Sequence, residues 1–217
     1  MPLDPLQERI ARMALALPEA RTLALAGGGA MIAHGYIARE TKDIDLFTEV
    51  DDNEAVRVAR SLRRVLEAES LLVRDGDQPP HDHRFVVCDP VDGRECTVEV
   101  FADGSRLRRR VALDVGAVLH PDDLAADKVL ALWGRARPRD YLDVSALLEI
   151  FGANRLLALA AEKDAGFTVA TFLDALRAIA RLGPQDWAED GIGPEIAERM
   201  RTVFNDWQAQ LQASQGQ

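Results

Sequence analysis

Two aspartates, Asp43 and Asp45, stand on either side of one isoleucine in the segment DIDLF. The alternation of apolar and acidic positions predicts a β-strand. In a strand, residues i and i+2 point to the same side about 7 Å apart. Two like charges at this spacing are costly unless a cation lies between them, and carboxylates suit Mg²⁺ or Mn²⁺. The pair therefore predicts a metal site for phosphoryl chemistry; the alternative is a solvated pair on an edge strand.

Three glycines, Gly27 to Gly29, precede this strand, and thirteen residues separate Gly29 from Asp43. The apolar run before them, residues 21–26, predicts a short strand, and AMIAHGY after them predicts a short helix. Glycines at a strand-to-helix turn offer backbone N–H groups to a phosphate. The segment therefore predicts a phosphate-binding turn ahead of the carboxylate pair.

The stretch LAGGGAMIAHGYIARETKDIDLF resembles the opening of the AbiEii-type nucleotidyltransferase toxins, within the DNA polymerase β-like nucleotidyltransferase superfamily. The motif of such families runs Gly-Gly, a small residue and Ala, then Arg-x-Thr/Ser-x-Asp-h-Asp, where h is apolar. The matching positions here are Gly27, Gly28, Gly29, Ala30, Arg39, Thr41, Asp43 and Asp45. Gly29 departs from the pattern, because the family often has Ser or Thr there. The resemblance implies nucleotide binding by the glycines, Arg39 and Thr41, with altered phosphate contact at Gly29.

The superfamily also uses a third carboxylate on a later strand, and the resemblance implies Glu99, in TVEVF. Alternation puts Glu99 on the side opposite its two valine neighbours. The second candidate is Asp103, in the turn sequence ADGS. The implied roles are metal binding by Asp43, Asp45 and Glu99, all three catalytic, with Glu99 orienting or deprotonating the attacking hydroxyl. The alternative places Glu99 on the wet face of a hairpin.

A second polar stretch, DKVLALWGRARPRDYLDV, resembles the distal motif of the same family. The matching positions are Lys128, Arg135, Arg139, Asp140 and Asp143. The resemblance implies that the first four bind the nucleotide, with the lysine as a point charge and arginine as a fork. It also implies that Lys128 and Asp143 are catalytic, with an aspartate holding Lys128 or Arg39 in place. The alternative is an ordinary pair of helices joined by ion pairs.

The elements that must position these residues change character along the chain. Helices are predicted from Pro5, capped by Asp4, and over residues 52–68, and RFVVCDPVDGRECTVEVF predicts a β-hairpin. From Pro121 onward the chain predicts helices to Trp133, from Arg139 to Ile150, and roughly three more, while SLLVR and RRRVALDV predict short strands. The sequence therefore predicts an α+β fold, with an α/β-type N-terminal half. A nucleotidyltransferase core with a mixed sheet covers residues 1–119, and a helical domain with the second motif covers residues 120–217.

The formal net charge of −10 argues against a passive nucleic-acid binder. The segment RLRRR, residues 106–110, could still form an acceptor-RNA patch; the alternative is a solvated strand or loop. No window is long and apolar enough for a membrane span, and no signal-peptide pattern is present, so a cytoplasmic location without membrane contact is expected. Cys88 and Cys96 are therefore expected as reduced thiols.

Three histidines have simpler interpretations. His34 is expected to be a structural residue on the short helix. His81 and His83 form an H-x-H pair in a loop and are expected to be incidental rather than metal ligands.

The residues and the resemblance together imply transfer of a nucleoside monophosphate from an NTP such as ATP, with Mg²⁺ or Mn²⁺, to a hydroxyl acceptor. The family implies a toxin that modifies tRNA and a cognate antitoxin; a protein or small-molecule acceptor stays open. Two alternatives belong to other classes. One is a catalytically silent nucleotide- or partner-binding member, and the other is a helical interaction module.

Overall fold

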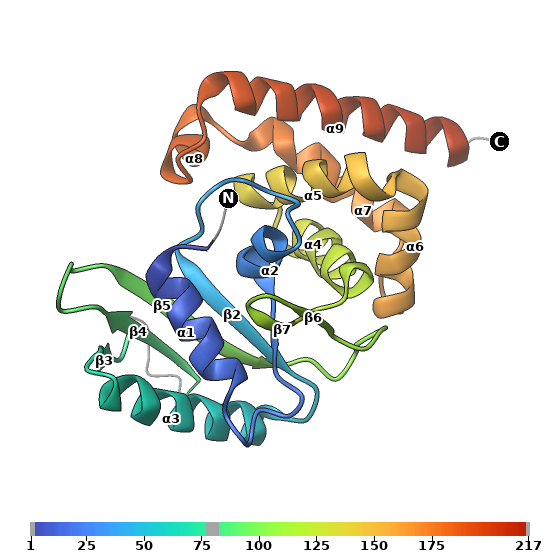
Figure 1. The fold of residues 1–217 in the computed structure, drawn as a ribbon. Coiled ribbons are helices and arrows are strands. Elements are labelled where there is room, and N and C mark those ends of the chain that lie inside the picture. Colours follow the sequence, from blue (N-terminus) through green and yellow to red (C-terminus); the bar gives the residue numbers. More distant parts are fainter. Residues whose placement is uncertain (1–2, 77–82, 216–217) are drawn as a thin grey trace. The chain divides into compact units, whose positions relative to one another are not determined.

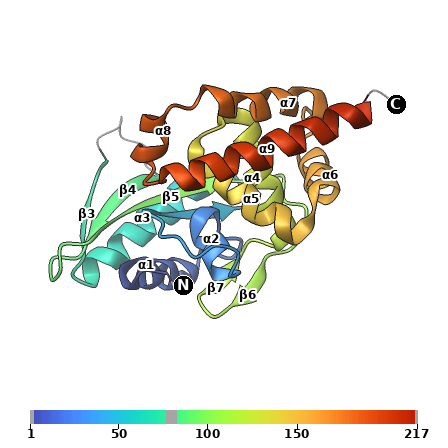
Figure 2. The ribbon, with the colours of Figure 1, turned by 90° about the horizontal axis from the view of Figure 1, so that it is seen from above.

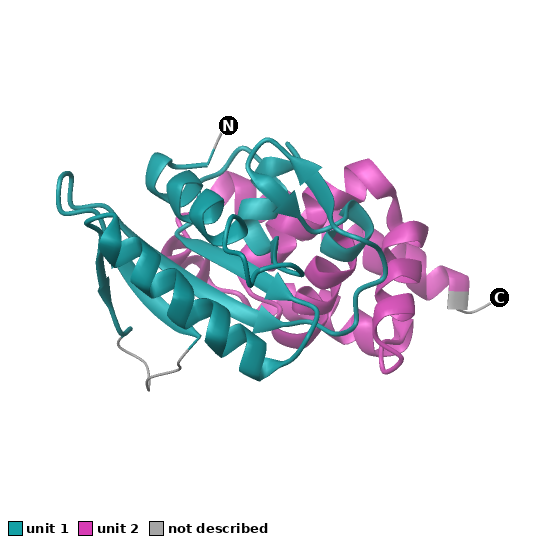
Figure 3. Cartoon of the chain, turned by 60° about the horizontal axis from the view of Figure 1, so that its bottom comes forward, with its two compact units in different colours: residues 1–124 teal, residues 125–217 magenta. Residues whose placement is uncertain are grey.

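The computed structural model describes residues 3–76 and 83–215. The chain divides into two compact units, Met1–Leu124 and Ala125–Gln217, coloured separately in Figure 3. Each unit is described on its own below.

Unit 1 opens with a helix whose start follows from local chemistry. The Asp4 side chain accepts from the Leu6 N–H, and Pro5 occupies the first turn, where its missing N–H costs nothing. The helices of unit 1 are α1 (Pro5–Leu15), α2 (Gly27–Ala33) and α3 (Asp52–Ala68). Its strands are β1 (Ala24–Leu25), β2 (Asp43–Thr48), β3 (Leu72–Arg74), β4 (Arg84–Cys88), β5 (Glu95–Ala102), β6 (Val111–Leu113) and β7 (Gly116–Val118).

The seven strands form one mixed sheet in the order β3-β4-β5-β2-β1-β7-β6 (Figure 1). The strand β2 pairs in parallel with β5 and antiparallel with β1. The pair β4 and β5 is the predicted hairpin, with Cys88 opposite Glu95. Both neighbours of β2 are therefore fixed by continuous ladders, which holds its side chains in a defined register.

One face of the sheet forms the core of unit 1. Ile44 and Leu46 of β2 and Val98 and Val100 of β5 are fully buried. The helices α1 and α3 cover this face and lie on the same side of β2 and β5 in Figure 2. Because side chains alternate along a strand, the residues between these apolar positions point to the opposite face.

Unit 2 contains only helices within the part of the chain that the structure describes. The helices that lie in or run into it are α4 (Pro121–Arg135), α5 (Pro138–Phe151), α6 (Ala153–Lys163), α7 (Val169–Ala178), a 3₁₀ turn η1 (Ile179–Arg181), α8 (Pro184–Glu189) and α9 (Pro194–Gln215). Aromatic rings form its core: Tyr141 packs edge-on against Phe204, and its hydroxyl donates to the Ala175 carbonyl at 2.7 Å. Burial raises the pKa of Tyr141.

The α+β class, the mixed sheet and the helix at residues 52–68 are confirmed. Four details differ. The predicted strand over residues 21–26 is a strand only at Ala24–Leu25, and the helix after it begins at Gly27 rather than after the glycines. The strand β7 was not predicted, and the described part of unit 2 has four α-helices after α5 rather than three. The predicted boundary at residues 119 and 120 stays a prediction.

Within residues 3–76 and 83–215, no single helix has both the length and the apolar composition that a membrane crossing needs. The helices α5 and α6 reach that composition only as a pair bent by 113°.

Candidate active site

A row of charged side chains crosses three strands on the face opposite the core. Asp45 of β2 is the register partner of Glu99 on β5, and Glu99 is the register partner of Arg84 on β4. Register partners point to the same face of a sheet. The Arg84 guanidinium lies 3.9 Å from the Glu99 carboxylate, so the third carboxylate has a cation beside it.

Asp43 lies on the same face, two residues before Asp45, opposite Thr97 of β5. The side chains of Asp43, Asp45 and Glu99 are partly exposed, whereas the residues that alternate with them are buried. Among the described residues, no group of three or more His, Cys, Asp or Glu side chains is gathered closely enough to form a ready metal cage. The predicted metal ligands thus share a face and neighbouring strands.

The glycine turn packs directly against this row. Gly27 has φ +56°, a conformation that L side chains rarely adopt. A Cβ at Gly27 would lie 1.7 Å from Oδ2 of Asp45, and the Ala26 N–H donates to the Asp45 carbonyl at 2.9 Å. Only glycine allows the backbone to approach the carboxylate this closely. The first turn of α2, whose N-cap residue Ala26 makes no side-chain cap bond, therefore begins beside Asp45.

The second glycine has a packing role. A Cβ at Gly28 would lie 2.5 Å from Cγ2 of Thr41, which is buried. The Gln7 side-chain amide donates to the Thr41 carbonyl at 2.8 Å and lies 3.2 Å from its hydroxyl. Thr41 therefore joins α1, the glycine turn and the start of β2. Its predicted role in nucleotide binding stays a prediction.

At the third glycine, the space for a side chain is small. A Cβ at Gly29 would lie 3.1 Å from Cδ1 of Leu25, a fully buried residue of β1. A serine or threonine here would require Leu25 to move by a few tenths of an ångström. Gly29 thus departs from the family motif at a position where the Leu25 side chain fills the space that a serine or threonine side chain would need.

Two further sequence candidates lie in connecting segments. Arg39 lies between α2 and β2, and its Nη1 donates to the Glu40 carbonyl at 3.2 Å. Asp103, the second candidate for the third carboxylate, accepts from the backbone N–H and the hydroxyl of Ser105 at 3.2 and 2.8 Å. Asp103 therefore forms a turn, while Glu99 is in register with Asp45.

In unit 2, the second motif forms ion pairs. The Lys128 ammonium lies 2.8 Å from Asp143, and both side chains are largely buried, at 11% and 3% exposure. Arg135 lies 2.8 Å from Asp140, which also accepts from the Arg137 N–H at the start of α5. Each aspartate therefore fixes a cation.

Arg139 contacts Asp190 at 2.8 Å within unit 2. The guanidinium is therefore held by a carboxylate outside the motif. Its predicted nucleotide contact stays a prediction.

The basic segment at residues 106–110 is a loop in which two arginines have a structural role. Arg106 is 5% exposed and donates to the carbonyls of Thr22 and Phe47. The Arg110 guanidinium donates to the Leu23 carbonyl. Arg106 and Arg110 satisfy carbonyls near the ends of β1 and β2, while Arg108 and Arg109 are exposed, so the loop is solvated in part and the acceptor-RNA patch stays a prediction.

The histidines agree with the simpler interpretation where the structure describes them. His34 bonds the Leu119 carbonyl through Nε2 at 2.8 Å, and its burial lowers its pKa. His83 has a ring contact with Phe101, while His81 lies outside the described residues. Cys88 and Cys96 are free thiols. The pKa of Cys96 is raised to about 12, mainly by burial and secondly by the nearby charge of Asp43.

Sequence reasoning missed two residues that support the carboxylate row. Arg84 was not singled out, although the Asp92-Gly93 turn fixes the hairpin register and so places Arg84 opposite Glu99. Gln7 was missed because only the fold brings α1 to Thr41, 34 residues later.

A mixed sheet with carboxylates on adjacent strands beside a glycine turn defines a fold of the nucleotidyltransferase class. Residues 10–212 match the sequence model of a protein family that is described as the nucleotidyl transferase AbiEii toxin of type IV toxin–antitoxin systems. The chain belongs to this family. It is therefore a nucleotidyltransferase of toxin–antitoxin type. A search of curated proteins gave no match to the sequence.

Solved structures of similar fold share little sequence with the chain. JHP933 from Helicobacter pylori is 15% identical, with a TM-score of 0.55, over 99% of this chain and 97% of that one. MenT4, the nucleotidyltransferase toxin Rv2826c from Mycobacterium tuberculosis H37Rv, is 14% identical, with a TM-score of 0.51, over 82% of this chain and 67% of that one. At such identities the likeness shows the fold.

Proposed function

We propose that the chain transfers a nucleoside monophosphate from an NTP to a hydroxyl of tRNA, with release of pyrophosphate and dependence on Mg²⁺ or Mn²⁺. The observation that carries the proposal is the carboxylate row: Asp43 and Asp45 share a face of β2, and Glu99 is the register partner of Asp45. The tRNA acceptor rests on the family alone, and so do a cytoplasmic site of action and a cognate antitoxin.

The reaction is a displacement at phosphorus. The acceptor oxygen forms a bond to the α-phosphorus, the bond from that phosphorus to the bridging oxygen breaks, and pyrophosphate leaves with the electron pair. The hydroxyl proton passes to a base, and Glu99 is the proposed one. Arg84, 3.9 Å from Glu99, would help to hold that carboxylate in place.

The donor set suits a divalent ion. Asp43, Asp45 and Glu99 offer only carboxylate oxygens, which Mg²⁺ and Mn²⁺ prefer, and like charges on one face favour a cation between them. The three lie on one face of two neighbouring strands, so Asp43, Asp45 and Glu99 would hold the ion together. A bound ion would offset the charge that develops on the leaving pyrophosphate.

The glycine turn is the proposed site for the triphosphate. Gly27 brings the start of α2 against Asp45, so phosphate oxygens held there would lie beside the proposed metal ligands. Gly28 and Gly29 would offer their backbone N–H groups, because neither carries a side chain. Arg39 and Thr41 complete the predicted set, with Thr41 acting through its position.

The second motif supplies the proposed cationic contacts to the nucleotide. Lys128 and Arg135 are each held by a buried carboxylate at 2.8 Å, from Asp143 and Asp140. A cation fixed in this way loses little side-chain entropy when it binds a phosphate. Arg139 is proposed as a third contact. Asp140 and Asp143 would act by positioning rather than by direct contact.

An incorporation assay tests the proposal. The purified chain is incubated with Mg²⁺ or Mn²⁺, each of the four labelled NTPs, and pools of tRNA, protein and small hydroxyl acceptors. We expect label on tRNA with at least one NTP, and loss of that label in Asp45→Asn. The control Asp52→Asn removes an exposed carboxylate from α3 and should retain activity.

If the label appears on protein or a small molecule instead of tRNA, the proposed acceptor is wrong and the proposed nucleotidyl transfer still stands. An absence of label on every acceptor with all four NTPs would contradict the proposed function.

A further inference from the structure

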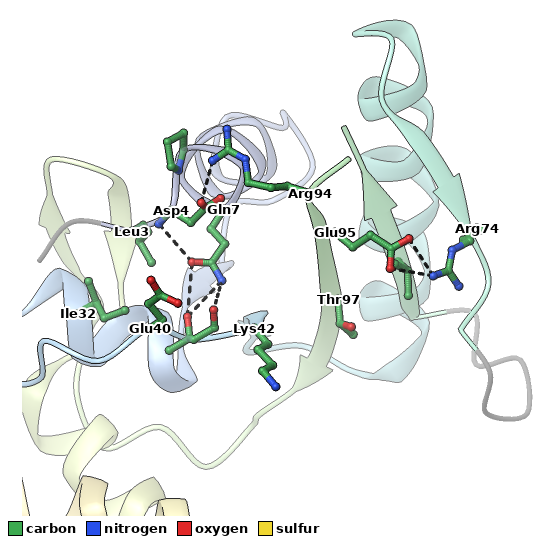
Figure 4. A pocket seen from close by; sticks show the side chains of 13 residues that line it. Leu3, Asp4, Gln7, Ile32, Glu40, Lys42, Arg74, Arg94, Glu95 and Thr97 are labelled. Atoms are coloured by element: carbon green, nitrogen blue, oxygen red, sulfur yellow. Dashed lines mark hydrogen bonds and ion pairs between the residues drawn. The ribbon is translucent and has the colours of Figure 1, made fainter. Parts of the chain in front are cut away.

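A cavity of about 640 Å³ lies in unit 1 beside the start of β2 (Figure 4). Thirteen residues line it, from α1, α2, the segment before β2, and the strands β3, β4 and β5. This volume falls within the range of about 300–1,000 Å³ that holds small organic ligands. None of the residues assigned above as metal ligands lines it, and Thr41 is the residue that it shares with the proposed nucleotide set, so it is a neighbouring subsite.

The cavity touches the carboxylate row at one place. Its wall includes Thr97, which is the register partner of Asp43 and points to the same face of the sheet. It also includes Lys42, the residue directly before Asp43. A molecule in the cavity would therefore lie next to the strand on which the chemistry is proposed.

The cations in the wall differ in what they already contact. Arg74 binds both carboxylate oxygens of Glu95 at 3.0 Å, and Arg94 binds Asp4 at 2.8 Å. The Lys42 carbonyl accepts from the Thr97 N–H at 3.4 Å, while its side chain is exposed and its ammonium makes no hydrogen bond or ion pair with any residue that the structure describes. Its ammonium is thus available for an anion from outside the chain.

The remaining lining suits a nucleoside next to that anion. Ile32 of α2 and Val86 of β4 provide apolar surface, while the Thr97 hydroxyl provides a hydrogen-bonding group. The walls are tied together, because Gln7 bonds the Thr41 carbonyl at 2.8 Å and Arg94 bonds the helix cap Asp4. A pocket held in this way loses little entropy on binding.

The sheet order decides which substrate fits. Gly27 follows β1 after one residue, so the proposed triphosphate turn lies on the β1 side of β2. The strand residues of the cavity wall, Arg74, Val86, Glu95 and Thr97, belong to β3, β4 and β5 on the other side of β2, while Ile32 and Thr41 border the glycine turn. Attacking and leaving oxygens lie roughly in line across the transferred phosphorus. The leaving pyrophosphate and the attacking acceptor should therefore occupy opposite sides of the carboxylate strand.

We propose that this cavity binds the 3′-terminal nucleoside of a nucleic-acid acceptor, with Lys42 on the phosphate that precedes it. The proposal rests on the proposed nucleotidyl transfer and names the acceptor subsite of that reaction. One charged contact sets the recognition: a single-stranded end carries this phosphate, whereas a protein hydroxyl or a free nucleoside does not.

Equilibrium binding without NTP tests the subsite separately from the reaction. The probes are a ribonucleoside, a dinucleoside monophosphate with one internucleotide phosphate, and a short single-stranded RNA with a free 3′-hydroxyl. In Lys42→Gln we expect about tenfold weaker binding of the two phosphate-containing probes, the loss of one charge-assisted contact, and unchanged binding of the nucleoside. The slope of the logarithm of the RNA binding constant against the logarithm of salt concentration should decrease in magnitude by about one.

Arg57→Gln is the matched control. It removes one exposed positive charge from α3, the helix that covers the core face of the sheet, and should change neither binding nor slope. With an active NTP, Lys42→Gln should raise KM for the RNA acceptor about tenfold and leave KM for the NTP unchanged.

The outcomes separate the two proposals. RNA binding that depends on Lys42, without transfer from any NTP, would support the subsite and contradict the proposed function. Active transfer with equal acceptor KM in wild type and Lys42→Gln would overturn the subsite and leave the function standing. Label on protein, with no binding of the RNA probes, would also overturn it.

Discussion

The carboxylates of the two units differ in what surrounds them. In unit 1, Asp43, Asp45 and Glu99 are partly exposed on a sheet face, and Glu99 lies 3.9 Å from Arg84. In unit 2, the side chains of Asp140 and Asp143 are 2% and 3% exposed, and each lies 2.8 Å from a lysine or arginine.

This difference separates two uses of the same side chain. A buried carboxylate that contacts a cation closely holds that cation, and removing it leaves a charge without compensation in a low-dielectric place. A partly exposed carboxylate beside others of its kind stabilises little, because like charges repel, and its value lies in what it can bind. Substitutions in unit 1 should therefore cost activity, and those in unit 2 should cost stability.

The largest expected effect is on activity in unit 1. Asp43→Asn should lower kcat by about 10²-fold or more, the cost of losing one preorganised charged group at the reacting phosphate. Its thermal midpoint should stay within about 2 °C of wild type or rise, because one of two like charges is removed. Paired activity and melting measurements check this, and a fall in both together would mean that Asp43 is structural.

The second effect is on stability in unit 2. Asp143→Asn should lower the free energy of unfolding by about 3 kcal/mol, because Lys128 is left largely buried without its partner. Urea denaturation measures the loss. Asp174→Asn is the control, since the exposed pair of Asp174 with Arg177 should contribute less than about 0.5 kcal/mol. Equal losses of unfolding free energy in Asp143→Asn and Asp174→Asn would contradict the proposed stabilising role of the buried ion pair.

The third effect concerns the contact between the glycine turn and the carboxylates. Gly27→Ala combines a positive φ with a Cβ 1.7 Å from Asp45, whereas Gly35→Ala has φ +75° and open space. In both variants the strained backbone should lower the free energy of unfolding by about 1 kcal/mol. Only Gly27→Ala should also displace Asp45 and lower activity. If both variants lose activity equally, the close approach has no functional role.

The smallest effect compares the two thiols. Cys96 is 2% exposed and its pKa is raised to about 12, mainly by burial, whereas Cys88 is partly exposed. Alkylation at pH 8 should modify Cys88 first. Because the folded pKa of Cys96 is raised, the stability from its neutral thiol is present below pH 9 and is lost as pH rises towards 12. Equal alkylation of both thiols in the folded chain would contradict the burial of Cys96.

Much of the site was predictable from short spacings. The alternation in DIDLF placed Asp43 and Asp45 on one face, and that in TVEVF placed Glu99 on the side opposite its valine neighbours, because the period of a strand is fixed. The shared face of all three follows only from the pairing of β2 with β5. The sequence also predicted the glycine turn. It did not predict why Gly27 must be glycine, because the approach of Gly27 to Asp45 depends on how β1 pairs with β2.

Contacts distant in sequence could not be predicted. The bond from Gln7 to Thr41 arises only after α1 packs on the sheet. The basic run at residues 106–110 suggested solvent or RNA, whereas tertiary structure uses Arg106 and Arg110 to satisfy backbone carbonyls. Charge runs are ambiguous in sequence because a guanidinium can serve a phosphate or a carbonyl equally well.

Binding of Mn²⁺ together with an NTP analogue that cannot be cleaved between the α- and β-phosphates tests the central claim most directly. Electron paramagnetic resonance reports the bound ion without requiring turnover. We predict that wild type binds Mn²⁺ with the analogue, that Asp45→Asn loses this binding, and that Asp174→Asn, which removes an exposed carboxylate from α7, retains it. Equal Mn²⁺ binding by wild type and Asp45→Asn would contradict the assignment of the sheet carboxylates as the metal and triphosphate site.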